Sequence, residues 1–584
     1  MSKINLTINN QIIEAEAGST ILEAARANNI FIPTLCYLKD YTGTGACRVC
    51  NVEVVGARSL CAACVYPVTE GMVVKTNSAK ALKARKDIVE LILSNHAQNC
   101  LSCMRNTNCE LQALAQIVGV RADSFTGEKS KPTYDEVSPG IVRDTSKCVL
   151  CGRCVAACEK IQGLGVLGFS ERGFKTKVGP VFDHSLQDVN CIQCGQCVNV
   201  CPTGALVEKE EIHDVINALS DNTKHVIVQT APAIRASLGE EFGMPIGTRV
   251  TGKMVTALKL LGFDKVYDTD FGADLTIMEE GTEFIHRLQN GGTLPMITSC
   301  SPGWINYCEQ EYPELIKNLS SCKSPHMMFG AILKSYYAKE MNIKPEDIYV
   351  VSIMPCTAKK GEKQRIENLT TGLQDVDAVL TTRELGRLIK MFGIGFNDLI
   401  DSEFDQDMFG EYSGASVIFG TSGGVMEAAL RTVSEILTKK ELKDIEFKTV
   451  RGVTGLKEAT ININGIDVCV GIAQSMSVAK PILDDIVNHK SKYHFIEIMG
   501  CPGGCINGGG QSYISATVRN GMNEGLFKQM RANALYDEDK LSANRKSHNN
   551  KQINELYDKF LQAPGSELAH HLLHTVYRPK PRFK

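Results

Sequence analysis

The stretches CVLCGRCVAAC (residues 148–158) and CIQCGQCVNVCP (residues 191–202) repeat one spacing of cysteines, with gaps of two, two and three residues. Runs of this kind bind two 4Fe4S clusters, and the fourth cysteine of each run ligates the cluster of the other run. We therefore predict a double 4Fe4S domain over residues 128–210. Its ligand sets would be Cys148, Cys151, Cys154 and Cys201 for one cluster, and Cys191, Cys194, Cys197 and Cys158 for the other.

A second group of candidate ligands precedes these runs, in the segment HAQNCLSCMRNTNC (96–109). It follows the stretch AKALKARKDIVELILSN (79–95), whose apolar spacing predicts a helix. The gaps of three, two and five residues place one imidazole and three thiols in a single turn-rich loop. Tetrahedral zinc accepts this ligand set equally well, but the neighbouring motifs favour a 4Fe4S cluster, in a domain over residues 81–127. Its ligands would be His96, Cys100, Cys103 and Cys109.

A further group lies in the first 80 residues, with gaps of ten, two and thirteen residues between its cysteines. The segments INLTINN (4–10), GSTILEAARANN (18–29) and IPTLC (32–36) predict a hairpin, a helix and a loop. This order resembles the small ferredoxin-like 2Fe2S domains of complex I subunits. Cys61 competes with Cys64 as a ligand, but Cys64 fits the spacing of that family. The 2Fe2S ligands of domain 1–80 would be Cys36, Cys47, Cys50 and Cys64.

The composition indicates metal ligation rather than disulfide bonding. The chain has 584 residues and 23 cysteines, 16 of them before residue 202. An odd number of cysteines in short repeated spacings is a poor disulfide framework, and this length predicts several domains. The net charge of -3 gives no footprint for nucleic acid or an anionic membrane. Because neither a signal sequence nor a membrane-spanning apolar run is visible, we expect a cytoplasmic protein.

Residues 211–584 have the rhythm of an α/β domain. Apolar, β-branched runs alternate with amphipathic helical stretches; the runs are HVIVQTA (225–231), DIYVVSIMP (347–355), ASVIFGT (415–421) and YHFIEIMG (493–500). Cys300, Cys356, Cys501 and Cys505 stand at or just beyond the ends of expected strands. Strand ends are where α/β domains place their sites. The predicted fold class is therefore α+β and α/β multidomain, with ferredoxin-like domains before an α/β domain.

Three motifs around these cysteines resemble those of the FeFe hydrogenases. TSCSPGW (298–304), MPCTAKK (354–360) and EIMGCPGGCINGG (497–509) are similar to the family's TSCCPxW, MPCxxKxxE and ExMACxxGCxxGG. The resemblance covers essentially the whole chain, including the order of the accessory groups. It implies a two-lobed catalytic domain with an H-cluster, in which one cysteine sulfur links a 4Fe4S cube to a two-iron unit. That unit carries carbonyl, cyanide and an azadithiolate bridge.

The resemblance also implies roles for individual residues. Cys356 and Cys501 would hold the cube, and Cys505 would bridge to the two-iron unit. Lys359 would give a cationic hydrogen bond to a cyanide, and Met354 would pack beside the cluster; such groups tune the metal rather than react. The other expected cofactor contacts are Ala231, Pro232, Phe419 and Met499.

The first motif departs from the family, because Cys300 is followed by Ser301 where the family has two cysteines. In the family the first cysteine relays protons and the second ligates the cube. Since iron favours thiolate, we expect Cys300 to ligate the cube here, with serine ligation or an iron without a protein ligand as alternatives. Two further changes, Ala233 for the family's serine and MGCPGG for MACHGG, predict the loss of a hydrogen bond to cyanide.

A proton relay is the last expected feature of the catalytic domain. Glu280, Glu283 and Arg287 lie at positions i, i+3 and i+7 of a helix-like segment and therefore share one face. They match the family's carboxylate relay, with Ser320 between the two acids; a solvated charged face is the competing interpretation. Cys308, Cys322 and Cys469 match no motif, and we expect them to pack in the core.

The resemblance predicts reversible conversion of dihydrogen into two protons and two electrons. The expected cofactors are one 2Fe2S cluster, three accessory 4Fe4S clusters and the H-cluster. The expected partners are ferredoxin or a similar small carrier and the hydrogenase maturation proteins, in a monomer without contacts to nucleic acid or membrane. No glycine run has the strand-to-helix GxGxxG arrangement of a nicotinamide or flavin site.

Three alternatives remain open. The first is a hydrogen sensor or an enzyme strongly biased toward hydrogen oxidation. The second is an electron-transfer or cluster-scaffold protein with an inactive catalytic domain. The third is a subunit like those of complex I, in which the three catalytic motifs would have no role.

Overall fold

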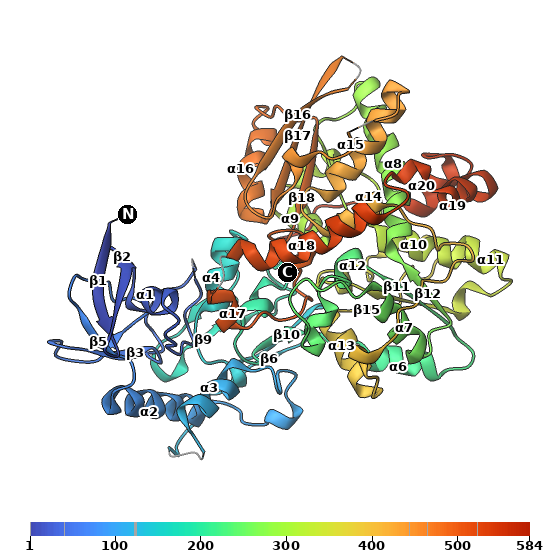
Figure 1. Cartoon of the computed structure of the whole chain (residues 1–584). Helices are drawn as coiled ribbons and strands as arrows, with labels where there is room; N and C mark the ends of the chain where they lie inside the picture. The colour runs from blue at the N-terminus through green and yellow to red at the C-terminus, as the bar shows by residue number, and fades with distance from the viewer. Residues whose placement is uncertain are drawn as a thin grey trace.

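The computed structural model describes residues 2–39, 41–121, 125–442, 444–463, 465–521 and 524–583. In Figure 1 the chain runs from a small N-terminal lobe, coloured blue, into a larger body that contains two separate sheets. The predicted fold class is confirmed, because ferredoxin-like domains precede a two-lobed domain of helices and sheets. Among the described helices, none is both long and apolar enough to cross a membrane.

The N-terminal domain is a five-stranded sheet with one helix. β1 (Lys3–Ile8) and β2 (Gln11–Glu16) form the expected hairpin, and its two turn residues Asn9 and Asn10 both have positive φ. Such turns match the twist of the paired strands. α1 (Ile21–Ala27) begins at a capping box between Thr20 and Glu23. The strand order is β2-β1-β5-β3-β4, with β3 (Asn51–Val54), β4 (Cys61–Ala62) and β5 (Val73–Lys75).

The next two domains are small and loop-rich. α2 (Ala79–Asn95) covers the predicted helix 79–95, starts at the Ser78 cap and ends directly before His96. α3 (Glu110–Val118) follows the cysteine loop. The double domain has a sheet of β6 (Tyr134–Asp135), β7 (Ile141–Asp144) and β10 (Leu206–Glu208), the pair β8 (Gly168–Ser170) and β9 (Lys177–Gly179), and the short helices α4 (Arg153–Ala156) and α5 (Gln196–Val200).

The body has two four-stranded sheets. The first is entirely parallel, in the order β12 (Lys265–Asp268), β11 (His225–Thr230), β14 (Ile348–Ile353) and β15 (Ala378–Leu380). The second has the order β13 (Met296–Ile297), β18 (Phe495–Met499), β17 (Ile466–Gln474) and β16 (Lys457–Ile463), and only the edge strand β16 is antiparallel. Parallel strands end at one edge of a sheet, so each lobe gathers its strand ends on one side.

One long helix joins the two lobes. α8 (Thr269–Gln289) places Phe271 and Leu275 in the core of the first lobe, and Ile277 and Phe284 in the core of the second. The main helices around the two sheets are α6 (Ile212–Ser220), α7 (Thr251–Leu261), α9 (Pro302–Glu311), α10 (Pro325–Ile332), α12 (Lys359–Glu362), α13 (Thr382–Met391), α15 (Gly424–Thr438), α16 (Met476–Val487), α18 (Glu524–Leu541), α19 (Lys551–Leu556) and α20 (Glu567–Leu573).

The expected strand at ASVIFGT (415–421) is wrong. This segment forms α14 (Gly414–Val417) and a 3-10 turn, and the Ser413 hydroxyl caps the helix by accepting from the Ser416 N–H. Val417 and Ile418 are fully buried. A short apolar run that is buried on all sides has no period to distinguish strand from helix, so the cap decides.

Candidate active site

A cavity of about 90 Å³ lies where strands of both sheets end. Ala231 and Pro232 follow β11, Met354 follows β14, and Met499 ends β18. Together with Phe419 and Lys359, these residues line the cavity, so the structure brings all the expected cofactor contacts together. The two lobes therefore build one shared, mostly apolar site at their strand ends.

Three thiols converge on this cavity. Cys356, Cys501 and Cys505 all line it; Cys501 is buried, and the other two are partly buried. Burial, with the charge of Cys356 adding to it, raises the pKa of Cys505 to about 12. A buried thiol of this kind stays protonated unless a metal cation takes the proton's place. Clustered soft ligands in a dry cavity fit an iron–sulfur cube.

Glycines let the loops around these thiols pack against each other. A Cβ on Gly508 would lie 1.9 Å from the Pro355 carbonyl oxygen, and one on Gly504 would lie 2.6 Å from the Ser422 nitrogen. Gly504 also has a φ of 91°, which side-chain residues rarely adopt. The glycine-rich segment 503–510 therefore forms a close backbone cradle around the cavity.

The side chains of Cys300 and Ser301 have different neighbours. Burial, then the charge of Glu280, raises the pKa of the Cys300 thiol well above its ordinary value, while Lys359 opposes the shift. Ser301 instead accepts a hydrogen bond from the Gly500 N–H at 3.1 Å, directly before Cys501. Cys300 thus lies near Glu280 and Cys505, and Ser301 lies beside the backbone that leads into Cys501.

Lys359 brings a cation to the cavity wall. Its Nζ donates to Glu362 at 2.8 Å and to the Cys300 carbonyl oxygen at 3.3 Å. Burial alone would raise the pKa of Glu362, but the Lys359 charge and a hydrogen bond from His326 hold it well below its usual range. The lysine is therefore fixed from behind by a carboxylate, as a group that binds an anionic ligand requires.

A chain of acids and hydroxyls leads outward from Cys300. Glu280 is 1% exposed, and burial together with the charge of Glu283 raises its pKa to about 8. The Ser320 hydroxyl lies between the two acids and donates to Glu283 at 2.9 Å, while Arg287 donates to the same carboxylate at 2.5 Å. The competing interpretation of a solvated charged face is wrong for Glu280, because its carboxyl is enclosed.

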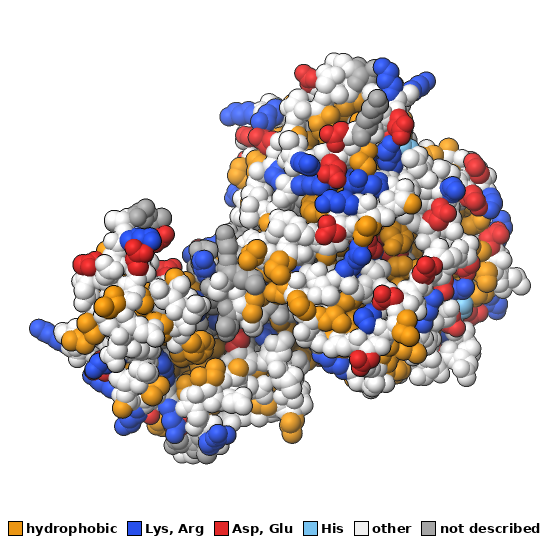
Figure 2. Space-filling model, viewed as in Figure 1, with side chains coloured by type: hydrophobic (Ala, Val, Ile, Leu, Met, Phe, Trp, Pro, Cys, Tyr) orange, Lys and Arg blue, Asp and Glu red, His pale blue; other side chains and the backbone are white. Residues whose placement is uncertain are grey.

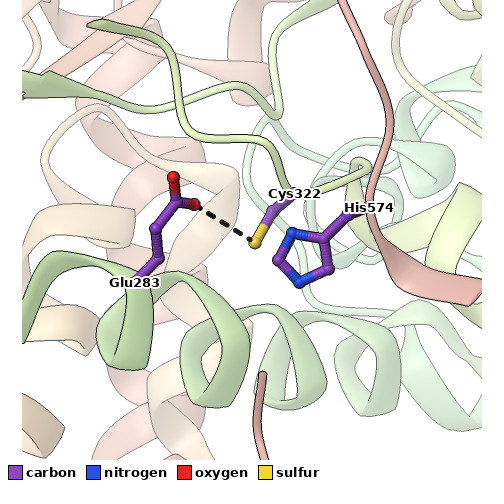
Figure 3. Close-up of side chains that lie close together, drawn as sticks. All are labelled: Glu283, Cys322 and His574. Atoms are coloured by element: carbon purple, nitrogen blue, oxygen red, sulfur yellow. Dashed lines mark hydrogen bonds between the residues drawn. The ribbon is translucent and has the colours of Figure 1, made fainter. Parts of the chain in front are cut away.

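The outer end of this chain is covered by the C-terminal segment. Figure 3 shows Glu283, Cys322 and His574 close together, with the Cys322 thiol 4.0 Å from the Glu283 carboxylate. His574 lies 2.8 Å from the Ser321 hydroxyl through Nδ1 and 3.0 Å from Glu279 through Nε2. Cys322 is fully buried, as expected of a core residue. No local sequence pattern predicts the contact of Cys322 with Glu283, because the two are 39 residues apart. The contact of Glu279 with His574 joins residues over 250 positions apart, so it has no local signal either.

The accessory cysteines gather in the expected sets. The thiol of Cys36 hydrogen-bonds that of Cys47, and the thiol of Cys50 that of Cys64, whereas only burial affects the pKa of Cys61. The charge of Cys201 acts on Cys148, Cys151 and Cys154, and that of Cys158 acts on Cys191, Cys194 and Cys197. The fourth cysteine of each run therefore lies beside the first three of the other run, as the predicted crossover would require.

The His96 group also forms a site. His96, Cys100, Cys103 and Cys109 line one hollow, and among the described residues none hydrogen-bonds the buried Nδ1 of His96. An orphaned buried imidazole nitrogen beside three thiols fits a metal ligand set. The site geometry alone accepts iron or zinc.

These groups form a branched path rather than a single line. Arg153 lies near both Cys36 and Cys151, and a Cβ on Gly204 would lie 2.7 Å from the Cys103 thiol. The 2Fe2S group and the His96 group therefore both approach the cluster set that includes Cys151 and Cys201. Cys154 and Cys197 in turn bring the two 4Fe4S sets together.

The last set touches the cavity loops. The Cys501 thiol lies 3.9 Å from the Cys194 carbonyl oxygen, and Gln196 donates to the Asn507 carbonyl oxygen at 2.9 Å. A Cβ on Gly195 would lie 2.8 Å from Gly509, so only glycines permit this contact. The cysteine run 191–201 is thus packed directly against the loop that carries Cys501 and Cys505.

Comparison with known families covers each part of this architecture. Residues 224–509 match the C-terminal domain of the iron-only hydrogenase large subunit, and residues 526–580 match the iron hydrogenase small subunit. Residues 1–79 match a 2Fe-2S cluster binding domain, residues 85–123 the NADH-ubiquinone oxidoreductase-G iron-sulfur binding region, and residues 147–205 a 4Fe-4S dicluster domain.

Two relatives are similar to this chain over nearly its full length, and a solved structure is similar over the catalytic part. The chain is 47% identical to the NADP-reducing hydrogenase subunit HndD of Solidesulfovibrio fructosivorans, covering 100% of both chains. It is 43% identical to iron hydrogenase 1 of Clostridium pasteurianum, covering 98% of this chain and 99% of that one. The solved structure of apo [FeFe]-hydrogenase HydA1 from Chlamydomonas reinhardtii shares 39% identity and a TM-score of 0.55 over 63% of this chain and 99% of that one. The chain therefore belongs to the iron-only, or FeFe, hydrogenases, which are oxidoreductases acting on hydrogen, and it also has accessory iron–sulfur domains.

Proposed function

We propose that this hydrogenase converts dihydrogen reversibly into two protons and two electrons at an H-cluster, and that its electrons pass to or from ferredoxin or a similar small carrier. The observation that carries the proposal is the contact of Cys194 with Cys501, which joins the accessory sets to the cavity. When bound, the two-iron unit supplies the site at which dihydrogen is formed and split.

The chain's own residues hold this unit and serve its protons. The Lys359 ammonium binds an anionic ligand, and the apolar side chains of Met354, Phe419 and Met499 exclude water from the cavity. Cys300 and Glu280 exchange the proton with the chain through Ser320 to Glu283. The carboxyl of Glu280, whose pKa is about 8, suits proton transfer near neutral pH.

We also propose that Cys300 carries the proton and that Ser301 stands where the family has its fourth cube cysteine. The support is the placement of Cys300 toward Glu280 and of Ser301 toward Gly500. The cube would then have three thiolates and a harder, weaker fourth contact. This departure would place the chain in a divergent subgroup of the family.

Replacing Cys300 by Ala tests this assignment. We expect the Cys300→Ala variant to retain the iron of the cavity but to evolve hydrogen about 10²–10⁴ times more slowly, because one proton-transfer group is removed. Iron analysis and electron paramagnetic resonance of the cube, before the two-iron unit is added, measure the first quantity, and a hydrogen assay measures the second.

The matched variant is Ser301→Cys, which restores the family's pair of cysteines. It should bind the cube more firmly without slowing hydrogen evolution. Loss of the cube in Cys300→Ala would instead show that Cys300 is the ligand, as the preference of iron for thiolate suggests.

The proposed cofactor inventory is one 2Fe2S cluster, three accessory 4Fe4S clusters and the H-cluster. The support is four separate ligand sets before residue 202 and the thiol cluster of the cavity. Maturation proteins would install the two-iron unit, and we propose that the chain acts as a monomer.

The carrier would dock beside the exposed accessory groups. Leu101, next to Cys100, is 95% exposed, and such an apolar side chain beside a cluster suits a transient protein contact. On the face in Figure 2, acidic and basic side chains are interspersed. A second proposal, favoured by the full-length likeness to the NADP-reducing subunit, is that a partner subunit passes the electrons on to NADP.

Two other functions remain as proposals of lower rank. A hydrogen sensor or an oxidation-biased enzyme would share the fold and differ only in rate and direction. A scaffold without catalysis would resemble the cytosolic iron-sulfur assembly component 3 of Rattus norvegicus, which is 30% identical over 70% of this chain.

The test is to load the protein with the two-iron unit, record its infrared spectrum and assay both directions of the reaction. We expect carbonyl and cyanide bands together with hydrogen evolution and uptake when reduced or oxidised ferredoxin is supplied. A protein that shows no such bands in any preparation cannot be a hydrogenase of this kind. Bands with activity toward an artificial dye, but none with ferredoxin, would favour the proposal of a partner that passes electrons to NADP.

A further inference from the structure

One polar side chain of the cavity has no role in the proposed reaction. His326, the second residue of α10, lines the cavity and is 1% exposed. Its Nε2 lies 2.8 Å from the Glu362 carboxylate. Among the described residues none hydrogen-bonds its Nδ1, although that atom is buried. Buried polar atoms are almost always paired, so an unpaired one beside a cavity calls for a ligand.

The protonation of this ring follows from its neighbours. Burial, assisted by the charge of Lys359, lowers the pKa of His326 to about 4, against the opposing pull of Glu362. The ring is therefore neutral near pH 7. Since the ionised Glu362 can only accept, Nε2 carries the hydrogen and Nδ1 carries a lone pair. The polar atom left for a group in the cavity is thus an acceptor.

The ring is also held rigidly. A Cβ on Gly272 of α8 would lie 2.4 Å from the Pro325 carbonyl oxygen, so the start of α10 is pressed against α8. Gln229 of β11 donates to the His326 carbonyl oxygen at 2.9 Å. Glu362 binds the ring and Lys359 with the same oxygen, at 2.8 Å each. One carboxylate therefore fixes two cavity groups, the lysine and the imidazole.

We propose that His326 is a contact residue for the two-iron unit and accepts a hydrogen bond through Nδ1 from the amine of its azadithiolate bridge. The inference rests on the proposed function, because it needs that unit in the cavity. His326 would then be a polar contact of the site in addition to Lys359, and the Glu362 carboxylate holds both side chains. A purely structural histidine, buried only to pair with Glu362, is the competing interpretation.

The experiment compares His326→Leu, which removes the acceptor, with His326→Gln, which keeps a polar group. Each protein is loaded with a synthetic two-iron azadithiolate complex that carries carbonyl and cyanide, and its infrared spectrum is recorded. We expect the bands of His326→Leu to shift, and the bound unit to dissociate about 5- to 10-fold faster, as the loss of one hydrogen bond predicts. His326→Gln should show a smaller change in both.

The control is His225→Gln, because His225 is half-buried against Tyr337 and has no place in the cavity. Its bands and dissociation rate should equal those of the unaltered protein. Iron bound in the cavity before loading confirms that the catalytic domain of each variant is folded. Unchanged bands and dissociation in both His326 variants would overturn the inference, whereas missing bands in every protein, the unaltered one included, would overturn the proposed function instead.

Discussion

Replacing Glu280 by Gln is expected to slow hydrogen evolution by about 10²–10⁴-fold, the usual contribution of a positioned acid or base. The glutamine side chain would occupy the same space but could neither accept nor release a proton. The Ser320 hydroxyl has one hydrogen, which it gives to one acid at a time, so it cannot bypass the missing group. Initial rates with a reduced dye, at equal cavity iron, measure the effect.

The same variant should change the dependence on pH. Burial raises the pKa of Glu280 to about 8 from its ordinary value of 4.5, so the protein carries a protonated acid up to that pH. The unfolded chain releases this proton at lower pH, so folding stability falls as the pH rises from about 5 to about 8 and then levels off. Because the ionised acid cannot donate a proton, hydrogen evolution by the unaltered protein should decline above pH 8. In Glu280→Gln both this decline and the fall in stability should be absent.

Glu279→Gln is the matched control, because the neighbouring acid is equally buried but contacts Tyr557, the Gly565 N–H and His574 rather than Ser320. It should keep most of the hydrogen evolution rate. Equal rates in Glu280→Gln and the unaltered protein, at equal iron content, would remove Glu280 from the proton path.

Replacing Cys505 by Ala is expected to abolish hydrogen evolution. Cys505 lies on the glycine cradle, and its thiol lines the cavity beside Cys356. Alanine has no sulfur to join the two parts of the cofactor, and the cavity loses a soft ligand. Infrared spectroscopy after loading should show no protein-bound carbonyl or cyanide.

The accessory sets lie on other segments, so their absorbance should be unchanged in Cys505→Ala. Cys469→Ala is the control for a cysteine outside the cavity, since Cys469 pairs with Thr460 on the outer sheet. After loading, Cys469→Ala should show the same carbonyl and cyanide bands as the unaltered protein. Retained bands and activity in Cys505→Ala would disprove the assigned bridge.

The cysteine groups could be predicted from the sequence because the short gaps of each run keep its first three thiols on one loop. The neighbourhood of Cys201 and of Cys158 was predicted from the repeat of one spacing in two runs. The positions of Cys356 and Cys501 at the ends of expected strands predicted that both would lie at a site. The structure brings them to one cavity, where parallel strands of both lobes end.

Other features depend on contacts between distant segments. His326 belongs to no sequence motif. That one of its ring nitrogens is unpaired becomes evident only from the contact of the other nitrogen with Glu362. The orientation of Cys300 against Ser301 is a matter of which way two adjacent side chains point, which spacing does not determine. The buried run at 415–421 became helical because Ser413 caps it and bonds Asp274 of α8.

The C-terminal segment covers the outer end of the proposed proton path, and it lies on the same chain. Residues 526–580 match a domain described as a small subunit, yet here they belong to the same chain as Glu283 and Cys322. Tethering replaces a concentration-dependent association with an intramolecular one, at an effective concentration of about millimolar. Any opening of the contact of His574 with Ser321 and Glu279 would therefore close again at a rate that does not depend on dilution.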